Sequence, residues 1–248
     1  MSEIDRLNGR VRVVTGGATQ RSARDVIRSW ASQPQRGVIF DFNGTLSNDE
    51  PVLAEIFTGL FARHLRWHLP PSEYYRRLAG LSDREIVETA IAEHAPGDTN
   101  LAEYLLRRRR ELYREKVTDR SPITEAAATL VHRLAAEGVP MGIVTGAQRE
   151  DVCCVLEHSP VAKHITIVVT EEDVAEGKPH PEGFLRGARA LGLRPEQILV
   201  FEDSVPGVKA AIAAGMHCVA VTGTQDSTQL AGITGALVPG LAASLLDV

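Results

Sequence analysis

The stretch that decides the fold is Gly37-Val38-Ile39-Phe40 followed directly by Asp41-Phe42-Asn43-Gly44-Thr45. The first four residues form a continuous apolar run, which is typical of a strand buried on both faces of a parallel sheet. A carboxylate at the C-terminal end of such a strand lies where open α/β sheets bind their ligands. The pattern therefore predicts a parallel sheet with a functional carboxylate, Asp41, at its ligand-binding edge.

The composition is that of an ordinary globular protein. The chain has 248 residues, of which 44% are hydrophobic and 24% are charged, and its formal net charge is −5. This length suffices for one α/β domain with a modest insertion. A mildly acidic chain has no basic field that would attract nucleic acid or an anionic membrane surface, so we expect neither as a partner.

Neither a search for targeting signals nor the cysteines change the classification as an ordinary globular protein. No segment approaches the about 18 apolar residues of a membrane span, and the polar N-terminal residues lack a signal-peptide core, so we expect a cytoplasmic protein. Cys153, Cys154 and Cys218 fit neither a metal-binding spacing nor a disulfide framework, and we interpret them as reduced. No sequence pattern indicates an oligomeric state.

Apolar strands and helices alternate through the second half of the chain. Strict alternation implies an α/β fold, a doubly wound and mostly parallel sheet (a Rossmann-like core) with helices on both faces. The expected strands are Pro140–Val144, Ile165–Val169, Ile198–Phe201 and Cys218–Val221, and the expected helices are Ala126–Glu137, Arg149–His158, Glu182–Leu191 and Val208–Ala214.

Two regions depart from the alternation. Residues 48–119 contain no convincing strand and are too long for a simple crossover, so we expect an inserted helical cap there. The core then comprises residues 36–47 and 120–248. Residues 1–35 form an N-terminal extension to which the sequence assigns no role. Within it we expect a short strand at Val11–Val14, a helix at Ser22–Ser32 and a plain turn at Thr15-Gly16-Gly17, which lacks the GxGxxG spacing.

Four polar groups follow four of the expected strands, and in a doubly wound sheet they converge on one edge. Each residue type suits phosphoryl transfer. A carboxylate can attack phosphorus, a hydroxyl can hold a phosphoryl oxygen, a lysine can neutralise charge, and paired carboxylates can hold Mg²⁺. The groups are Asp41, Thr145-Gly146, Lys178-Pro179 and Glu202-Asp203-Ser204.

These motifs resemble the haloacid dehalogenase-like hydrolase superfamily, and within it the phosphatase and β-phosphoglucomutase-like branch with a helical cap. The similarity runs from about Arg36 to Val221 and includes Ala214-Gly215-Met216. It implies a mobile cap, bound Mg²⁺ and an aspartyl-phosphate intermediate on Asp41. The implied catalytic residues are Asp41, Asn43, Thr145 and Lys178. The implied metal ligands are Asp41, the Asn43 backbone carbonyl, Glu202 and Asp203, and we expect Gly44, Thr45 and Gly146 to bind substrate.

Asn43 departs from the family pattern. In the phosphatase branch a carboxylate at this position protonates the leaving oxygen and then activates water, whereas an amide exchanges no proton at neutral pH. General acid–base catalysis contributes about 10²–10⁴-fold, so its loss is a handicap and not an abolition. We therefore expect Asn43→Asp to raise turnover on poor leaving groups.

Three explanations of Asn43 stay open. The substrate has a good leaving group, or a cap residue supplies the proton, or turnover is slow and the protein mainly binds its ligand. The first two favour a phosphatase. The cap residues considered as the proton donor are Glu50, Asp83, His64 and His68.

Rival chemistries in the superfamily fit less well. A sugar-phosphate mutase depends heavily on the carboxylate that Asn43 replaces. A phosphonoacetaldehyde hydrolase needs a Schiff-base lysine in its cap, where no lysine precedes Lys116. Haloacid dehalogenases do not use the Glu202-Asp203 pattern. The predicted function is a Mg²⁺-dependent phosphomonoesterase for a small, sugar-like phosphorylated metabolite, with a mutase or a metabolite-binding protein as alternatives.

Gly80-Leu81-Ser82-Asp83-Arg84-Glu85 resembles the cap loop that faces the active site in this branch. Ser82 and Glu85 have the spacing of a capping box, and Ser82 is also expected to contact substrate. Arg84 is expected to clamp a second anionic group of the substrate. We interpret Arg107–Arg110 as a solvated face of a cap helix. We expect His64, Trp67 and His68 to share one helix turn, with Trp67 packed against the core. We expect His180 to support its loop or a neighbouring site residue and not to take part in catalysis.

Overall fold

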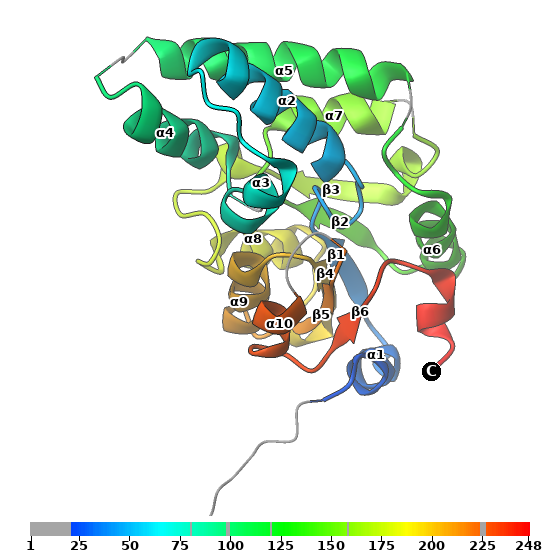
Figure 1. Ribbon diagram of the computed structural model, residues 1–248. Coiled ribbons are helices and arrows are strands. Elements are labelled where there is room, and N and C mark those ends of the chain that lie inside the picture. Colours follow the sequence, from blue (N-terminus) through cyan, green and yellow to red (C-terminus); the bar gives the residue numbers. More distant parts are fainter. Residues whose placement is uncertain (1–20, 80, 98–99, 120, 158, 224–226) are drawn as a thin grey trace, which may run out of the picture.

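The computed structural model describes residues 21–248 apart from 80, 98–99, 120, 158 and 224–226. At its centre is a six-stranded sheet with the order β3-β2-β1-β4-β5-β6. Every pair of neighbouring strands is parallel, which confirms the predicted doubly wound sheet (Figure 1). The strands are β1 (Gly37–Phe40), β2 (Met141–Val144), β3 (Ile165–Val169), β4 (Ile198–Glu202), β5 (His217–Val221) and β6 (Leu237–Val238).

The strand order reverses between β1 and β4. The chain runs outward from β1 through β2 to β3 and then returns to form β4 on the other side of β1. Phe40 pairs with Phe201 across these two strands, so Asp41 and Glu202 follow at the same level of the sheet. This is the topological switch point at which open α/β sheets bind ligands.

Helices cover both faces of the sheet because alternate side chains of each strand point to opposite faces. Val38 and Phe40 belong to the apolar cluster that includes α1 and α6, whereas Ile39 belongs to the cluster that includes α8 and α9. The core helices are α1 (Ala23–Ala31), α6 (Glu125–Ala136), α7 (Arg149–Glu157), α8 (Glu182–Ala190), α9 (Val205–Ala213) and α10 (Ser227–Ala231).

Helix α1 gives part of the N-terminal extension a structural role. Ser22 caps the helix by accepting a hydrogen bond from the backbone N–H of Asp25, so the predicted helix is confirmed. Trp30 is 1% exposed and its indole N–H donates to the carbonyl oxygen of Gly37 at 3.0 Å. The helix packs against β4 and β5 and thus covers one face of the sheet. The strand and turn expected at Val11–Val14 and Thr15-Gly16-Gly17 lie outside the described residues.

The chain between β1 and α6 leaves the sheet and forms a group of helices, in the upper part of Figure 1. They are α2 (Glu50–His64), α3 (Pro71–Arg77), α4 (Asp83–His94) and α5 (Leu101–Asp119), and we call them the cap. The described residues of this segment contain no β-strand. Aromatic packing stabilises the cap: Trp67 stacks on Phe61 at 5.4 Å and on His94 at 4.3 Å between ring centroids.

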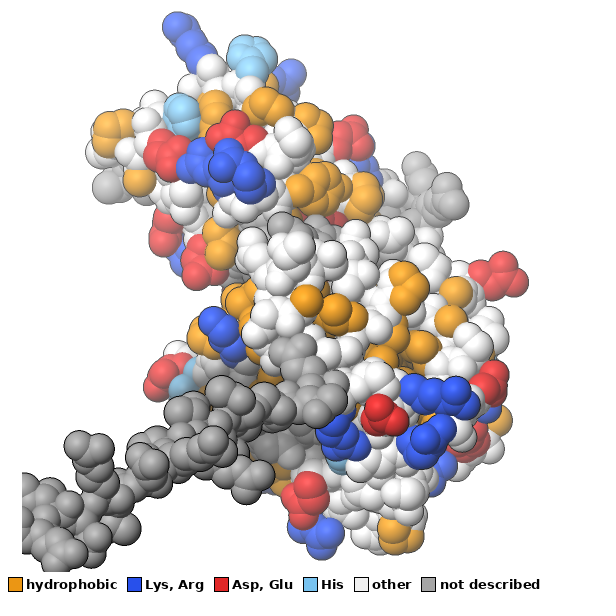
Figure 2. Space-filling model, turned by 60° about the horizontal axis from the view of Figure 1, so that its bottom comes forward, with side chains coloured by type: hydrophobic (Ala, Val, Ile, Leu, Met, Phe, Trp, Pro, Cys, Tyr) orange, Lys and Arg blue, Asp and Glu red, His pale blue; other side chains and the backbone are white. Residues whose placement is uncertain are grey.

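The face drawn in Figure 2 carries charges of both signs. In the face drawn in Figure 2, lysine and arginine side chains are interspersed with acidic ones. Among the described residues no helix is long and apolar enough to cross a membrane.

Candidate active site

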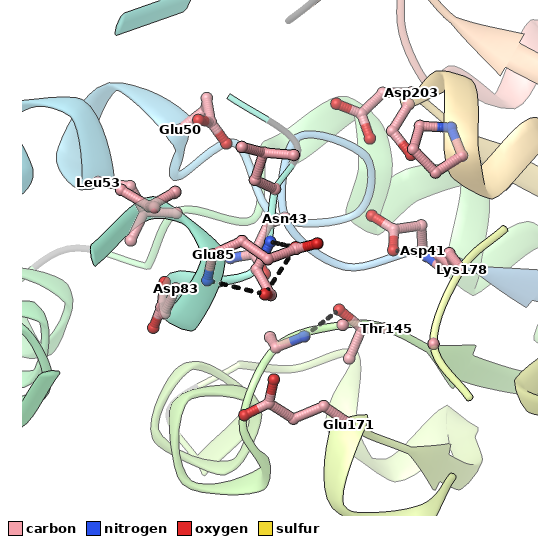
Figure 3. Close-up of a pocket in the computed structure, with 18 of the residues that line it drawn as sticks. Asp41, Asn43, Glu50, Leu53, Asp83, Glu85, Thr145, Glu171, Lys178 and Asp203 are labelled. Carbon is pink, nitrogen blue, oxygen red and sulfur yellow. Dashed lines mark hydrogen bonds and ion pairs between the residues drawn. The ribbon is translucent and has the colours of Figure 1, made fainter. Parts of the chain in front are cut away.

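A cavity of about 500 Å³ lies between the cap and the C-terminal ends of the central strands. Core residues form one side of it and cap residues form the other, as Figure 3 shows. We call these the core wall and the cap wall. The core wall includes Asp41, Asn43, Thr145, Gly146, Lys178, Glu202 and Asp203, and the cap wall includes Glu50, Leu53, Tyr74, Ser82, Asp83, Glu85, Ile86 and Arg109.

Lys178 joins the two carboxylates at the switch point. Its ammonium donates to Oδ1 of Asp41 and, at 2.6 Å, to Oε1 of Glu202. Asp41 is 6% exposed, so this ion pair is largely shielded from water. Three side chains that lie far apart in the sequence thus meet at the edge of the sheet, as the order of the strands predicted.

Burial and the neighbouring charges act on the pKa of Asp41 in opposite directions. Burial raises the pKa of Asp41 to about 7, the Glu202 carboxylate adds to the rise, and Lys178 opposes it. Burial disfavours the charge of Lys178, but the two carboxylates outweigh burial and raise the pKa of Lys178 above its usual range. Lys178 therefore stays cationic beside the carboxylate that we expect to attack phosphorus.

The position of Glu202 is set by the first turn of α9. Its Oε2 accepts from the backbone N–H of Ser204 at 2.6 Å and from the Ser204 hydroxyl at 2.9 Å. The hydroxyl oxygen of Ser204 in turn accepts from the backbone N–H of Gly207 and caps the helix. A Cβ atom at residue 207 would lie 1.7 Å from Oε1 of Glu202, so only glycine permits this close approach.

The donor set at the core wall fits Mg²⁺. Single carboxylate oxygens of Asp41, Glu202 and Asp203 all lie within 4.8 Å of one another. Thr45 donates to Oδ1 of Asp203 at 3.2 Å and holds it in this cluster. A group of oxygen ligands with several negative charges is what Mg²⁺ prefers. Both oxygens of Glu202 already accept hydrogen bonds, from Lys178 and from the backbone of Ser204.

The other predicted core residues divide into two sets. Thr145 and Gly146 lie on the cavity wall, and Oγ1 of Thr145 accepts from the backbone N–H of Ala147 at 3.0 Å, which leaves its proton free for a ligand. Gly44 and Thr45 are not brought to the wall. Gly44 has a φ of 77°, in the left-handed region, and forms the turn after β1. Thr45 positions Asp203 instead of facing the cavity.

Asn43 makes a contact that the sequence did not indicate. Its side-chain Nδ2 donates to Oδ2 of Asp49 at 2.7 Å, and the Tyr113 hydroxyl donates to the same oxygen. Asp49 is fully buried, and burial raises its pKa despite these donors. The amide at position 43 is therefore matched to a buried carboxylate beside it.

Arg109 corrects the interpretation of Arg107–Arg110 as a solvated face. Arg109 is only 1% exposed, and its guanidinium forms ion pairs with Asp83, at 3.0 Å, and with Asp151. It also lies over the ring of Tyr113, 4.7 Å from the centroid. Because Asp151 belongs to α7, this arginine ties the cap to the core. The sequence showed four consecutive arginines but could not show which one meets two remote carboxylates.

The cap loop before α4 is placed only partly as expected. Ser82 lies on the cap wall and forms the predicted capping box with Glu85. Arg84 is not brought to the wall. Its side chain is 57% exposed and pairs with Glu88 and Glu103, which leaves the expected clamp for a second anion without structural support.

Two of the four residues considered as the replacement acid reach the cavity. Glu50 and Asp83 lie on the cap wall. The expected helix turn shared by His64, Trp67 and His68 is not formed, because α2 ends at His64. His64 packs edge-on against Tyr104, and His68 is exposed in the segment that follows the helix. His180 is also exposed and accepts from the backbone N–H of Glu182, as expected of a loop residue.

Some wall residues had no recognisable sequence signal. Glu171 and Val174 reach the cavity from the loop after β3, and Tyr74 reaches it from α3. Their positions depend on how loops and cap helices pack, which no local pattern reveals. Tyr74 is fully buried and donates to Oε1 of Glu50 at 3.0 Å.

Comparison with known proteins identifies the family of this chain. A family model described as haloacid dehalogenase-like hydrolase matches residues 38–221. The validoxylamine A 7'-phosphate phosphatase of Streptomyces hygroscopicus subsp. limoneus is 32% identical over 195 residues, which cover 78% of this chain and 88% of that protein. A phosphoglycolate phosphatase of Shigella boydii is 30% identical over 204 residues, with coverages of 75% and 81%.

A solved structure shows the same fold. The putative β-phosphoglucomutase of Thermotoga maritima has a TM-score of 0.68 and 24% identity, and the match covers 86% of this chain and 97% of that structure. The chain belongs to the haloacid dehalogenase-like hydrolase family, as its motifs predicted.

Proposed function

We propose that this hydrolase is a phosphatase that removes the phosphoryl group from a small, sugar-like monophosphate. The observation that carries the proposal is the buried bridge from Lys178 to Asp41 and Glu202 at the switch point. The names of the curated relatives, a validoxylamine A 7'-phosphate phosphatase and a phosphoglycolate phosphatase, support the reaction class.

The residues of the core wall have distinct roles in this reaction. An Asp41 carboxylate oxygen attacks phosphorus and forms an aspartyl-phosphate. Lys178 offsets the negative charge shared by the nucleophile and the phosphoryl group, and the Thr145 hydroxyl donates to a phosphoryl oxygen. Asp41 and Asp203, with Glu202 and the Asn43 carbonyl, would hold Mg²⁺, which supplies the positive charge that lets an anionic carboxylate approach an anionic phosphate.

The charges of the cap wall favour a neutral sugar-like substrate with one phosphoryl group. Away from Lys178, the only cation among the described wall residues is Arg109, and it is already paired with Asp83 and Asp151. A second phosphate or a carboxylate would therefore find no free positive charge there. Sugar hydroxyls would find hydrogen-bonding partners, because the same wall presents the carboxyl groups of Glu50 and Glu85.

Phosphate release with Mg²⁺ tests the proposal directly. The panel comprises glucose 6-phosphate, a hexitol phosphate, fructose 1,6-bisphosphate, phosphoglycolate and acetyl phosphate. We expect release from the sugar monophosphates above the bisphosphate and phosphoglycolate. Asp41→Asn should lower it by about 10⁴-fold or more, the range found when a nucleophile is removed. Asp247→Asn, at an exposed carboxylate, is the matched control.

Two results would contradict the proposal. Release that survives in Asp41→Asn would exclude Asp41 as the nucleophile. No release from any phosphate, together with thermal stabilisation by some of them, would instead support the alternative of a metabolite-binding protein.

A further inference from the structure

We propose that Glu50 carries the proton that Asn43 cannot, protonating the leaving oxygen and then accepting a proton from the attacking water. The inference rests on the proposed phosphatase function. The Asn43 side chain is committed to Asp49 through its Nδ2 group, and an amide has no proton to exchange near neutral pH. For a leaving group that needs protonation, the proton carrier must therefore be another residue on the cavity wall.

The other carboxyl groups on the described wall are already occupied. Asp41, Glu202 and Asp203 form the cluster at the phosphoryl end. Burial raises the pKa of Asp83 to about 6 although the charge of Arg109 opposes the rise, but the Asp83 carboxylate is already held in its ion pair with that guanidinium, 3.0 Å away. Glu85 accepts from the backbone and the hydroxyl of Ser82 in the capping box.

Glu171 and Glu50 remain, and their surroundings differ. Glu171 is partly exposed, on the loop that follows β3. Glu50 is 5% exposed, and the partner of its Oε1 is the neutral hydroxyl of Tyr74, at 3.0 Å. A neutral donor fixes the orientation of the carboxyl group without forcing it to stay ionised. Glu50 is thus the wall carboxyl best held in place and best able to exchange a proton.

Glu50 lines the same cavity as the reacting groups, on the opposite wall. It is the first residue of α2, directly after the loop that contains Asn43 and Asp49. In Figure 3 its side chain lies on the cap side of the cavity, opposite Asp41, Lys178 and Thr145. A leaving group seated against the cap wall would lie between Glu50 and the phosphoryl site.

The surroundings of Glu50 tune its protonation to neutral pH. Burial raises the pKa of Glu50 to about 7, the Asp49 charge adds to the rise and the Tyr74 hydrogen bond opposes it. A general acid and base works best when its pKa lies near the working pH. The titratable and charged groups that face Glu50 are Asp49 before α2, Tyr74 and Tyr75 on α3, Asp83 at the start of α4 and Arg109 on α5.

The proton balance of the two steps is complete. In the first, an Asp41 oxygen bonds to phosphorus, the bond from phosphorus to the leaving oxygen breaks, and that oxygen takes the proton of Glu50. In the second, ionised Glu50 takes a proton from water, the water oxygen bonds to phosphorus, and the bond from phosphorus to Asp41 breaks. The products are the alcohol and inorganic phosphate, and Glu50 is again protonated.

The dependence of kcat/KM on the leaving group distinguishes an acid–base role of Glu50 from a role in substrate binding alone. With glucose 6-phosphate, whose alkoxide needs a proton, Glu50→Gln should lower kcat/KM by about 10²-fold or more. With p-nitrophenyl phosphate, whose leaving group needs little protonation, the loss should stay under about fivefold. Glu55→Gln, an exposed residue of the same helix, is the matched control. Equal losses on both substrates, or a larger loss in Glu171→Gln, would overturn the assignment.

The pH profile supplies a second readout. For the wild type, kcat/KM on glucose 6-phosphate should fall as pH rises above about 7, because Glu50 must be protonated for the first step. Glu50→Gln should abolish this alkaline limb. Tyr74→Phe removes a hydrogen bond that lowers the pKa of Glu50, so the limb should move to higher pH. If the fall of kcat/KM at alkaline pH is unchanged in both variants, the proposal is overturned.

The same data separate this inference from the proposed function. If p-nitrophenyl phosphate is hydrolysed by the wild type and not by Asp41→Asn, the phosphatase proposal holds. That conclusion stands even if Glu50→Gln leaves kcat/KM unchanged on both substrates. Such a result would overturn only the role of Glu50.

Discussion

The two walls of the cavity are built in different ways. On the core wall, Asp41, Lys178 and Glu202 each come from the C-terminal side of a parallel strand, and the switch point brings them together. On the cap wall, Arg109 of α5 holds Asp83 at the start of α4 and reaches Asp151 of α7. The core wall follows from backbone topology and the cap wall from side-chain packing. We therefore expect loss of the Lys178 bridge on the core wall to affect catalysis most, and loss of the Arg109 ion pairs on the cap wall to affect stability most.

The largest effect is expected from the lysine of the core wall. Lys178→Met should lower kcat/KM by about 10³-fold, because it removes a preorganised charge and leaves Asp41 and Glu202 unpaired. Steady-state phosphate release measures this effect. Lys209→Met, at an exposed lysine of α9, should change little. A loss below about tenfold would show that the bridge is structural and not catalytic.

The matching test on the cap wall concerns Arg109. Arg109→Met should lower the free energy of unfolding by about 3–5 kcal/mol, because the buried Asp151 and the partly buried Asp83 lose their shared partner. Urea denaturation measures the loss, with the exposed Arg107→Met as the control. A loss below about 1 kcal/mol would mean that Asp83 and Asp151 are readily resolvated, and the contrast between the walls would weaken.

A smaller loss of stability is expected on the core wall at the start of α9. Gly207→Ala places a Cβ atom against the Glu202 carboxylate and should cost about 1–3 kcal/mol through overpacking. The displaced Glu202 should also weaken phosphate release. Gly59→Ala is the control, because no atom lies within 4 Å of its added Cβ, and in the middle of α2 it should stabilise the protein. Equal thermal stabilities of the two variants would contradict this account.

The smallest effect concerns the contact between Asn43 and Asp49, and it changes an expectation drawn from the sequence. Asn43→Asp alone would set two carboxylates at the present 2.7 Å contact, so we now expect no gain in turnover from it. The double variant Asn43→Asp with Asp49→Asn restores one donor and one acceptor. A double-mutant cycle on the free energy of unfolding should give a coupling energy of about 1–2 kcal/mol between positions 43 and 49. A gain from Asn43→Asp alone would show that the two sites are independent.

Local patterns predicted the strands because each is a short apolar run between turns. Boundaries differ by one or two residues, as in Ile198–Glu202 against the expected Ile198–Phe201. Strand β6 was missed, since a two-residue strand, Leu237–Val238, has no periodicity to detect. The packing of α1 was also left open, because an amphipathic helix reveals its apolar face but not the surface that it covers.

By itself the sequence determined the parallel sheet and the residues at its ligand-binding edge. Alternating strands and helices permit few topologies, and the carboxyl ends of parallel strands meet at one edge, so Asp41, Thr145, Lys178 and Asp203 could be grouped from their order alone. Only the tertiary structure decided how the cap completes the site. The partners of Arg109, Asn43 and Glu50 come from other helices or the turn before α2, and hydrogen bonds and ion pairs between them depend on distances of a few ångströms that no sequence spacing encodes.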